Sequence, residues 1–314
     1  MSGEAIMKAA MIEQNGGPEV FVYGDLPDPT ANPGEVVVDI HAASVNAADW
    51  KVRSDEYGGA DLSFPYVLGR DFSGVMRTFG EGVDEFSAGD PVFGVCDVGQ
   101  EGAYAEQIAV KASIISSKPA AMSHIEASAI ALAGLTAIVS LEDTLRLQPS
   151  ETILIQGGAG GVAGFAIQLA KHLGAHVITT ASLANHEYLR ELGADEIIDY
   201  NTHDFTEIVS NCDAVLDTVG GNVAMMSFQV LKPGGRAAFI ASGAAAPIPL
   251  RDDVESLRPN VTRNRPRLQR ITELVDLGAV KIPPIQEYPL SEAAAAHRVS
   301  EKRHLKGKLV FRVR

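Results

Sequence analysis

Apolar and polar residues alternate along the first third of the chain, as they do in β-strands with one buried face. Val36, Val38, Ile40 and Ala42 occupy every second position of the run 35–43, so they share one face of an extended segment. Glycine- and proline-rich turns separate similar short runs at residues 8–12, 20–23, 72–77, 91–95 and 104–110. We therefore expect a twisted, barrel-like β domain.

The pattern becomes helical after Met122. Ser123 can cap a helix with Glu126 at the reciprocal position of a capping box, and the alanine-rich sequence up to Ala137 favours helix. From Thr152 onward, strand-like runs alternate with helical segments, and repeated units of this kind build a doubly wound parallel sheet. We expect strands at 153–155, 176–180, 196–198, 213–217 and 236–241, and helices ending at 172 and covering 187–192 and 223–231.

The C-terminal part returns to a mixed pattern. It predicts a helix over 262–277 that ends at Gly278, a strand over 280–285, a helix over 291–300 and a closing strand over 308–313. A closing strand that rejoins the N-terminal β domain would make that domain discontinuous. We therefore divide the chain into an N-terminal part (1–126), a central α/β unit (127–280) and a C-terminal part (281–314) that returns to the first.

A glycine cluster follows the first strand of the α/β unit and opens a helix. The spacing Gly158-x-Gly160-Gly161-x-x-Gly164 is common by chance, but its place between a strand and a helix makes it informative. Glycine lets the backbone approach a ligand closely, while the amides and the positive dipole end of the helix attract anionic oxygens. The cluster predicts a pyrophosphate site; the alternative is a tight turn with no ligand.

The end of the second strand of this unit distinguishes the two nicotinamide cofactors. A carboxylate there would bind the ribose 2′-hydroxyl and repel a 2′-phosphate, yet the stretch from Thr179 to His186 contains no acidic residue before Glu187. Ser182 and Asn185 can donate hydrogen bonds to a phosphate, and His186 can add partial positive charge. The sequence thus favours NADPH over NADH.

Composition limits the partners and the location of the protein. The formal net charge of −14 disfavours a nucleic-acid partner, and 46% hydrophobic residues are typical of a globular protein. Cys96 and Cys212 have neither a disulfide framework nor a metal-ligand spacing. We see no signal peptide and no apolar segment of membrane-spanning length, so we expect a cytoplasmic protein without a membrane partner.

Several further motifs, in their order and spacing, carry a resemblance that covers essentially the whole chain. They are Pro33–Val36, Ser44–Asp49, Gly69–Gly74, Gly89–Gly94, Gly102–Glu106, Gly134–Ala137, Leu192–Asp195 and Gly307–Val310. With the glycine cluster, they make the chain resemble the medium-chain dehydrogenase/reductase superfamily. Within it, the chain is similar to the zinc-independent quinone oxidoreductase and enone reductase branch.

The resemblance implies an α/β protein with two domains. A GroES-like, β-rich catalytic domain would be made from both chain ends, and a Rossmann domain with a doubly wound parallel sheet would lie between them in sequence. It also implies an active site in the cleft between the domains, and a homodimer. Zinc-using relatives place a cysteine where Asn46 stands and Gly-His-Glu where this chain has Gly69–Asp71. Asparagine and arginine are not zinc ligands, so we expect no metal.

The resemblance also assigns cofactor contacts. Gly160, Gly161 and Val162 would hold the pyrophosphate, and Tyr200 would lie near the 2′-phosphate of the adenosine. The other positions that would approach the cofactor are Lys51, Thr136, Ile240, Ala241, Ser242 and Lys308.

Without a metal, the chemistry best suited to such a site is hydride transfer to an electron-poor acceptor. We expect an NADPH-dependent reductase of quinones or α,β-unsaturated carbonyl compounds (enones and alkenals), in which the protein positions the partners and stabilises an oxyanion. Asn46 is expected to line the substrate pocket and orient the acceptor or the nicotinamide; alternatively it only organises its loop. Tyr57 and Tyr66 are candidate proton donors near the pocket mouth, although water can serve equally well.

Two carboxyl groups near this site receive structural roles, and two other functions stay open. We expect Asp49 to be a structural acceptor and Asp71 to pair with Arg70 or Arg53.

An enoyl-thioester reductase would need a groove that accepts phosphate groups. The only hint of one is the basic run from Arg258 to Arg270, which is more simply read as a solvated helix face. The other alternative is a non-catalytic NADPH-binding sensor or structural protein.

Overall fold

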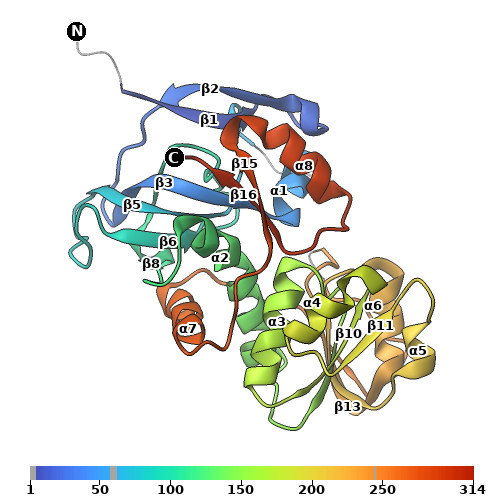
Figure 1. The fold of residues 1–314 in the computed structure, drawn as a ribbon. Helices are drawn as coiled ribbons and strands as arrows, with labels where there is room; N and C mark the ends of the chain where they lie inside the picture. Colours follow the sequence, from blue (N-terminus) through green and yellow to red (C-terminus); the bar gives the residue numbers. More distant parts are fainter. Residues whose placement is uncertain (1–4, 57–61, 244) are drawn as a thin grey trace. The chain divides into compact units, whose positions relative to one another are not determined.

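The computed structural model describes residues 5–56, 62–243 and 245–314, and these residues form two compact units (Figure 1). Unit 1 contains Met1–Leu132, Thr262–Asp276 and Pro284–Arg314; unit 2 contains Ala133–Val261 and Leu277–Pro283. The structure thus groups the helix at 265–276 with unit 1, whereas the sequence analysis placed it in the central unit.

Unit 1 is built mainly from antiparallel strands, in agreement with the alternating sequence pattern. A seven-stranded sheet has the order β15-β16-β3-β5-β6-β8, with β7 also paired to β3, and a smaller sheet has the order β2-β1-β4. The strands are β1 (Ile6–Ile12), β2 (Phe21–Pro27), β3 (Glu35–Val45), β4 (Tyr66–Val67), β5 (Asp71–Phe79), β6 (Pro91–Val95), β7 (Gln107–Lys111), β8 (Ile115–Ser117), β15 (Ile285–Pro289) and β16 (Lys308–Arg312). The helices are α1 (Ala47–Arg53), α7 (Arg265–Asp276) and α8 (Ala293–Glu301).

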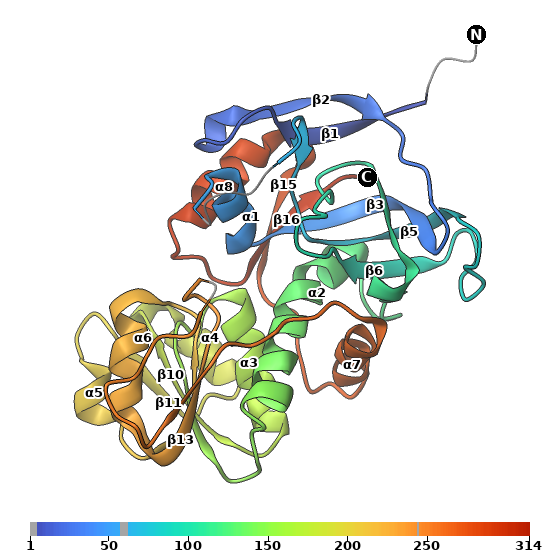
Figure 2. The ribbon, with the colours of Figure 1, turned by 180° about the vertical axis from the view of Figure 1, so that it is seen from behind.

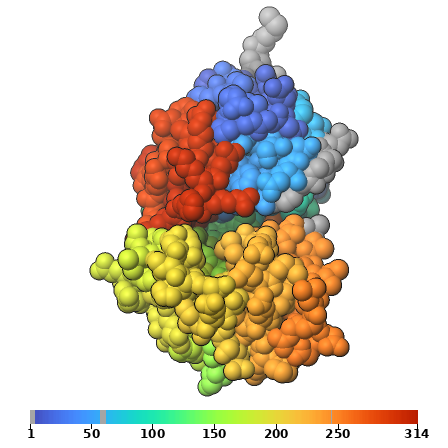
Figure 3. Space-filling model, turned by 90° about the vertical axis from the view of Figure 1, so that its right-hand side faces the viewer, coloured from blue at the N-terminus to red at the C-terminus, as the bar shows by residue number. Residues whose placement is uncertain are grey.

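The two chain ends meet in unit 1, as the sequence analysis expected. Strand β16 pairs antiparallel with β3, with Leu309 opposite Val45 and Val310 opposite Ser44. Helices α1 and α8 lie side by side in Figures 1 and 2. In Figure 3 the C-terminal residues, in red, cover a face beside the N-terminal residues, in blue. Unit 1 is therefore discontinuous in sequence.

The predicted strand over 280–285 is wrong, because the corresponding strand is β15 and begins only at Ile285. Pro283 and Pro284 precede it, and proline has no amide hydrogen to donate to a ladder. β15 runs parallel to β16 and forms the edge of the seven-stranded sheet.

Unit 2 is the doubly wound unit that the alternation predicted. Its six strands are all parallel and have the order β11-β10-β9-β12-β13-β14. The sequence leaves β9 for β10 on one side and returns for β12 on the other, so the switch point lies between β9 and β12. The strands are β9 (Thr152–Ile155), β10 (His176–Ala181), β11 (Glu196–Asp199), β12 (Cys212–Asp217), β13 (Leu231–Phe239) and β14 (Glu255–Leu257). The helices are α3 (Gly161–His172), α4 (His186–Glu191), α5 (Phe205–Ile208) and α6 (Gly221–Ser227).

The boundary between α6 and β13 differs from the prediction. The helix ends at Ser227 instead of 231, and the strand begins at Leu231 instead of 236. The register shifts between the pairs Cys212–Leu231 and Ala214–Arg236, because Lys232-Pro233-Gly234-Gly235 forms an irregular part of the strand. The sequence analysis assigned this run neither to the helix nor to the strand.

Helix α2 (His124–Ile138) begins at the predicted capping box and continues as a π-helical segment, Val139–Thr144. The Ser123 amide donates to Glu126 Oε2 over 2.8 Å, and the Glu126 amide donates to Ser123 Oγ over 3.2 Å. Contrary to our expectation, His124–Thr144 is long and apolar enough to cross a membrane. However, 78% of its most apolar window is buried inside the protein, which is equally typical of a core helix in a soluble protein.

Candidate functional site

The glycine turn lies at the carboxyl edge of the unit 2 sheet, at the switch point where parallel sheets bind their ligands. Gly157 has a φ of +72°, which favours glycine, and a Cβ atom on Gly158 would lie 2.3 Å from Thr179 Oγ1. At Gly160, the N-cap of α3, a Cβ atom would meet only the Gly157 carbonyl oxygen, 3.5 Å away. Space is therefore open in front of the N-terminus of α3, and this geometry fits a pyrophosphate.

Polar side chains that sequence reasoning missed hold this turn in place. Thr180 Oγ1 donates to Gln156 Oε1 over 2.7 Å and accepts from the Gly157 amide over 3.1 Å. Thr218 Oγ1 donates to the Gln156 carbonyl over 2.8 Å. The signal in the sequence was that Gln156, Thr180 and Thr218 lie at the carboxyl ends of buried strands. Neighbouring parallel strands bring these ends together, so such side chains can bond one another.

The residues expected to select the cofactor lie directly after β10. Asn185 Nδ2 donates to Ser182 Oγ over 3.2 Å, so these two side chains contact one another. His186 is buried at the start of α4, and its Nε2 lies 3.4 Å from the Ala181 carbonyl oxygen, so the ring faces the backbone. Tyr200 is exposed just after β11. The turn after β10 contains no carboxylate before the exposed Glu187.

The other predicted cofactor residues divide between the two units. In unit 2, Gly161 and Val162 form the first turn of α3, and Thr136 is buried in α2. Ile240, Ala241 and Ser242 follow β13, where Ser242 Oγ donates to the Ala245 carbonyl over 2.9 Å. In unit 1, Lys51 forms an ion pair of 3.1 Å with Glu56 and lies over the Trp50 ring. Tyr57 lies outside the described residues.

A second polar cluster lies in unit 1 around Asn46, the N-cap of α1. Asn46 Nδ2 donates to Asp71 Oδ1 over 2.9 Å, and Lys308 Nζ donates to Asn46 Oδ1 over 2.6 Å. Asp71 and Lys308 are buried, while Asn46 is partly exposed. Burial lowers the pKa of Lys308, and the nearby Asp71 opposes that change. The structure thus brings together two residues, Asn46 and Lys308, that the sequence analysis had assigned separately.

The expected pairing of Asp71 with Arg70 or Arg53 is wrong. Asp71 instead accepts from Asn46, from Ser44 Oγ over 2.8 Å and from the Leu132 amide over 3.1 Å. β5 begins at Asp71 and its partner β3 leads into Asn46, so the carboxyl group faces this strand end. Burial raises the pKa of Asp71, and its hydrogen-bond donors oppose that rise.

Arg70 and Tyr66 bind a different acid, Glu101. Arg70 Nε lies 3.0 Å from Glu101 Oε1, and the Tyr66 hydroxyl donates to Glu101 Oε2. Burial and Glu101 together raise the pKa of Tyr66 well above its usual range. Tyr66 therefore stays protonated, with its hydroxyl hydrogen bonded to a neighbouring carboxylate. This makes it a poor proton donor to a substrate.

Asp49 is the structural acceptor that the sequence analysis predicted. Its Oδ2 accepts from the backbone amide of Asn46 and from the Tyr104 hydroxyl, each over 2.8 Å. His297 Nε2 lies 3.3 Å from that hydroxyl, and His297 Nδ1 lies 3.0 Å from Arg53 Nη1. Arg53 also pairs with Glu301. A guanidinium can only donate, so His297 accepts through Nδ1 and donates through Nε2. This chain of buried groups supports the backbone of Asn46.

Acidification is expected to weaken unit 1 through His297. Burial, followed by the charge of Arg53, lowers the pKa of His297 to about 3, against 6.5 for the ordinary side chain. The unfolded chain then binds a proton that the folded chain does not, so stability falls by about 1.4 kcal/mol per pH unit below 6.5. Burial raises the pKa of Asp49 to about 7, which acts in the opposite direction, so a matched variant is needed.

We therefore expect the difference in urea unfolding free energy between wild type and His297→Gln to shrink by about 2 kcal/mol from pH 7.5 to pH 5. The contribution of Asp49 is shared by both proteins and cancels to first order. A difference that stays constant over this range would contradict the assignment.

Three arginines of the basic run, Arg258, Arg263 and Arg265, bond backbone carbonyls, whereas Arg270 pairs with the exposed Glu273 on α7 over 3.2 Å. Arg258 and Arg263 precede α7, and their side chains donate to the carbonyls of Phe239 over 2.7 Å and Cys96 over 3.2 Å, respectively. Arg265 donates to the Ala112 carbonyl over 2.6 Å. These guanidinium groups cap backbone carbonyls, so this run gives no support to a phosphate-friendly groove.

The residues around Asn46 do not fit a catalytic zinc ion. Zinc prefers thiolate, imidazole or carboxylate ligands. The amide of Asn46 is bonded to Lys308 and Asp71, and the guanidinium of Arg70 is paired with Glu101. Over residues 5–56, 62–243 and 245–314, no group of three or more His, Cys, Asp or Glu side chains could hold a metal.

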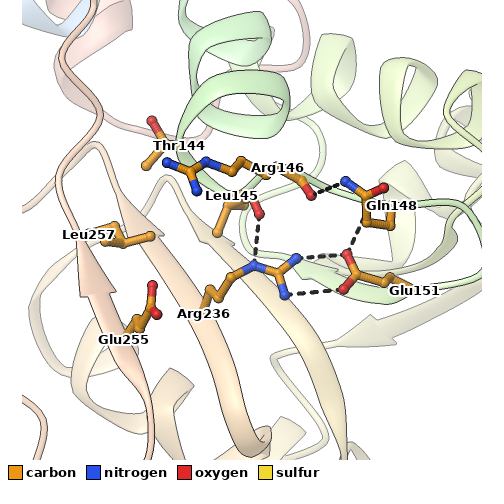
Figure 4. Close-up of a pocket in the computed structure, with 8 residues that line it drawn as sticks. All are labelled: Thr144, Leu145, Arg146, Gln148, Glu151, Arg236, Glu255 and Leu257. Carbon is orange, nitrogen blue, oxygen red and sulfur yellow. Dashed lines mark hydrogen bonds and ion pairs between the residues drawn. The ribbon is translucent and has the colours of Figure 1, made fainter.

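Unit 2 also contains a cavity of about 340 Å³ at the other edge of its sheet (Figure 4). Arg236 donates to both carboxylate oxygens of Glu151 over 3.1 and 2.7 Å, and to the Leu145 carbonyl over 2.7 Å. Glu151 precedes β9, whereas the glycine turn follows it, so this cavity is not part of the predicted cofactor site. Its lining residues are Thr144, Leu145, Arg146, Gln148, Glu151, Arg236, Glu255 and Leu257.

Comparisons with known proteins agree with the two-unit structure. Residues 32–120 match the alcohol dehydrogenase GroES-like domain, and residues 192–311 match the zinc-binding dehydrogenase family. The chain is 32% identical to NAD(P)H oxidoreductase RTN4IP1, mitochondrial, of Mus musculus, covering 98% of this chain and 89% of that protein. It is 30% identical to the NADPH-dependent alkenal/one oxidoreductase, chloroplastic, of Arabidopsis thaliana, covering 97% and 79%. The quinone oxidoreductase from Coxiella burnetii has a TM-score of 0.88 and 32% identity, covering 99% and 100%.

Proposed function

Because the chain belongs to the medium-chain dehydrogenase/reductase superfamily, we propose that it is an NADPH-dependent, zinc-independent reductase of quinones or of enones and alkenals. The relatives named as alkenal/one oxidoreductase and quinone oxidoreductase support this acceptor class. The observation that carries the proposal is the Asn46 amide, held between Lys308 and Asp71 where zinc-using relatives have a metal ligand.

The two units contribute different parts of this activity. In unit 2, the open turn at Gly160 and the N-terminus of α3 would hold the pyrophosphate. Bound NADPH supplies a hydride from the nicotinamide ring. In unit 1, Asn46 would donate a hydrogen bond to the carbonyl oxygen of the acceptor, on which negative charge develops as the hydride adds to the β-carbon. A fixed donor at that oxygen lowers the barrier because the charge is larger in the transition state than in the substrate.

An NADPH-oxidation assay with a quinone, an enone, an alkenal and an enoyl-CoA tests the acceptor class. We expect turnover of the quinone or of the unsaturated carbonyl compounds. Turnover of the enoyl-CoA alone would indicate an enoyl-thioester reductase. Tight NADPH binding without turnover of any acceptor would indicate the non-catalytic sensor or structural protein.

The preference for NADPH over NADH can be reversed at the end of β10. Ser182→Asp would place a carboxylate beside the expected 2′-phosphate, and we expect NADPH to bind about 30-fold more weakly while NADH binding is kept or improved. Calorimetric titration with both cofactors measures this shift. Ser150→Asp, at an exposed position just before β9, adds the same charge at the opposite edge of the sheet and should change neither affinity. Equal weakening of both cofactors by Ser182→Asp would overturn the preference.

A further inference from the structure

The side-chain amide of Asn46 has a defined orientation in unit 1. Its oxygen faces Lys308 Nζ at 2.6 Å, and the same Nζ donates to the Val45 carbonyl over 3.0 Å. An ammonium group has donors and no acceptor, so it can face only the oxygen of an amide. Lys308 thereby distinguishes the oxygen of Asn46 from its nitrogen.

Asp71 imposes the same orientation from the other end of the amide. Its Oδ1 accepts from Asn46 Nδ2 over 2.9 Å and from Ser44 Oγ over 2.8 Å, and its Oδ2 accepts from the Leu132 amide over 3.1 Å. The carboxyl group is thus anchored by β3 and by α2 independently of Asn46. Rotation of the Asn46 side-chain amide by half a turn would place its oxygen against the Asp71 carboxylate and its N–H groups against the Lys308 ammonium. Both hydrogen bonds would then be lost.

Among the residues that the structure describes, one N–H of Asn46 has only a long hydrogen bond. An amide nitrogen carries two hydrogens, and Asp71 takes one of them. The remaining neighbour is the Ser44 carbonyl oxygen at 3.5 Å, which is long for a hydrogen bond. Asn46 is also partly exposed, while Asp71 and Lys308 are buried. The group that this cluster presents outward is therefore the asparagine amide.

We propose that Lys308 and Asp71 are positioning residues that hold the Asn46 amide so that it offers an N–H, and not its oxygen, to the acceptor. This inference rests on the proposed function, because a donor is useful only where a carbonyl or quinone oxygen gains charge. Neither Lys308 nor Asp71 needs to touch the acceptor. Their effect on the reaction passes through Asn46.

A double-mutant cycle tests this dependence. Lys308→Met should lower kcat for the best acceptor, measured at saturating NADPH, by about tenfold or more. In an Asn46→Ala background, the same change should lower kcat by less than about twofold, because the amide it positions is gone. Equal losses in both backgrounds would overturn the inference, since Lys308 would then act independently of Asn46.

Lys118→Met is the matched control. Lys118 is another lysine of unit 1 that donates to backbone carbonyls, those of Pro119 and Met122. Its ammonium group bonds these carbonyls and not the Asn46 side chain, so its replacement should leave kcat unchanged. A comparable loss of kcat in Lys118→Met would show that the effect of Lys308→Met is a general result of removing a lysine.

Nuclear magnetic resonance of the cofactor-free protein gives a readout that does not depend on turnover or on the folding of Lys308→Met. The side-chain amide signals of Asn46, assigned by their loss in Asn46→Ala, should show one hydrogen that exchanges slowly with water and one that exchanges fast. Equally fast exchange of both hydrogens would overturn the inference. If the wild type reduces no acceptor, the proposed function fails whatever this spectrum shows. If it reduces enones while Lys308→Met has normal kcat, the inference alone fails.

Discussion

Gly160→Asp is expected to abolish NADPH binding while leaving the protein folded. Gly160 has φ −73° and ψ 161°, an extended conformation that any residue adopts, and its Cβ position is open. Aspartate is also a favourable N-cap residue, so the start of α3 should be at least as stable as before. The same carboxylate would occupy the place of the pyrophosphate and repel it. We expect the dissociation constant to rise by about 100-fold or more, or by about 3 kcal/mol.

Calorimetric titration with NADPH, together with a thermal melting curve, measures both effects. Ser150→Asp is the control, because Ser150 is exposed and precedes β9, at the opposite edge of the sheet from the glycine turn. It adds the same charge to unit 2 and should bind NADPH normally. Normal binding by Gly160→Asp would show that the phosphates do not lie at the N-terminus of α3.

Arg53→Met is expected to be the most destabilising single change in unit 1. Arg53 is 1% exposed and bonds the Gly16 carbonyl over 3.0 Å, His297 over 3.0 Å and the carboxylate of Glu301. Its removal leaves the buried His297 and the Gly16 carbonyl without their donor, which costs about 1 to 3 kcal/mol; Glu301 is 31% exposed, so water can solvate its carboxylate. Urea unfolding should therefore show a lower midpoint for Arg53→Met.

Arg77→Met provides the comparison. Arg77 pairs with Asp39 over 3.2 Å, but its side chain is 45% exposed, and a pair of this kind is worth at most about 1 kcal/mol. If Arg53→Met were no more destabilising than Arg77→Met, the buried chain from Glu301 to Asp49 would not be a stabilising feature. Removing Arg53 should also raise the pKa of His297, because its charge is one of the two causes that lower it.

The sequence predicted those parts of the fold that depend on local pattern. The run 152–155 and the glycine cluster identified the strand, turn and helix of the cofactor unit, because hydrophobic periodicity and turn chemistry act over a few residues. The closing strand at 308–313 was also predicted from its alternation. The exact start of β15 and the irregular start of β13 were not predicted, since proline and glycine there have effects that depend on the partner strands.

The candidate site was harder to predict, because its contacts join residues far apart in the chain. Lys308 and Asn46 are 262 positions apart and meet because Leu309 is opposite Val45 in the pairing of β16 with β3. The resemblance identified both positions without giving their contact. Asp71 was assigned to the wrong partners because charge alone favours arginine, whereas the strand register directs its carboxyl group toward Ser44 and Asn46.

The contribution of both chain ends to unit 1 has a consequence for the order in which the protein can mature during synthesis. All residues of unit 2 have been made by Pro283, whereas β16 begins only at Lys308. A growing chain can therefore acquire its nucleotide-binding unit before Lys308, the hydrogen-bond partner of the Asn46 side chain, has been synthesised. A nascent or shortened chain ending before Lys308 is expected to hold the cofactor without a complete acceptor site, which makes the last strand the step that switches on turnover.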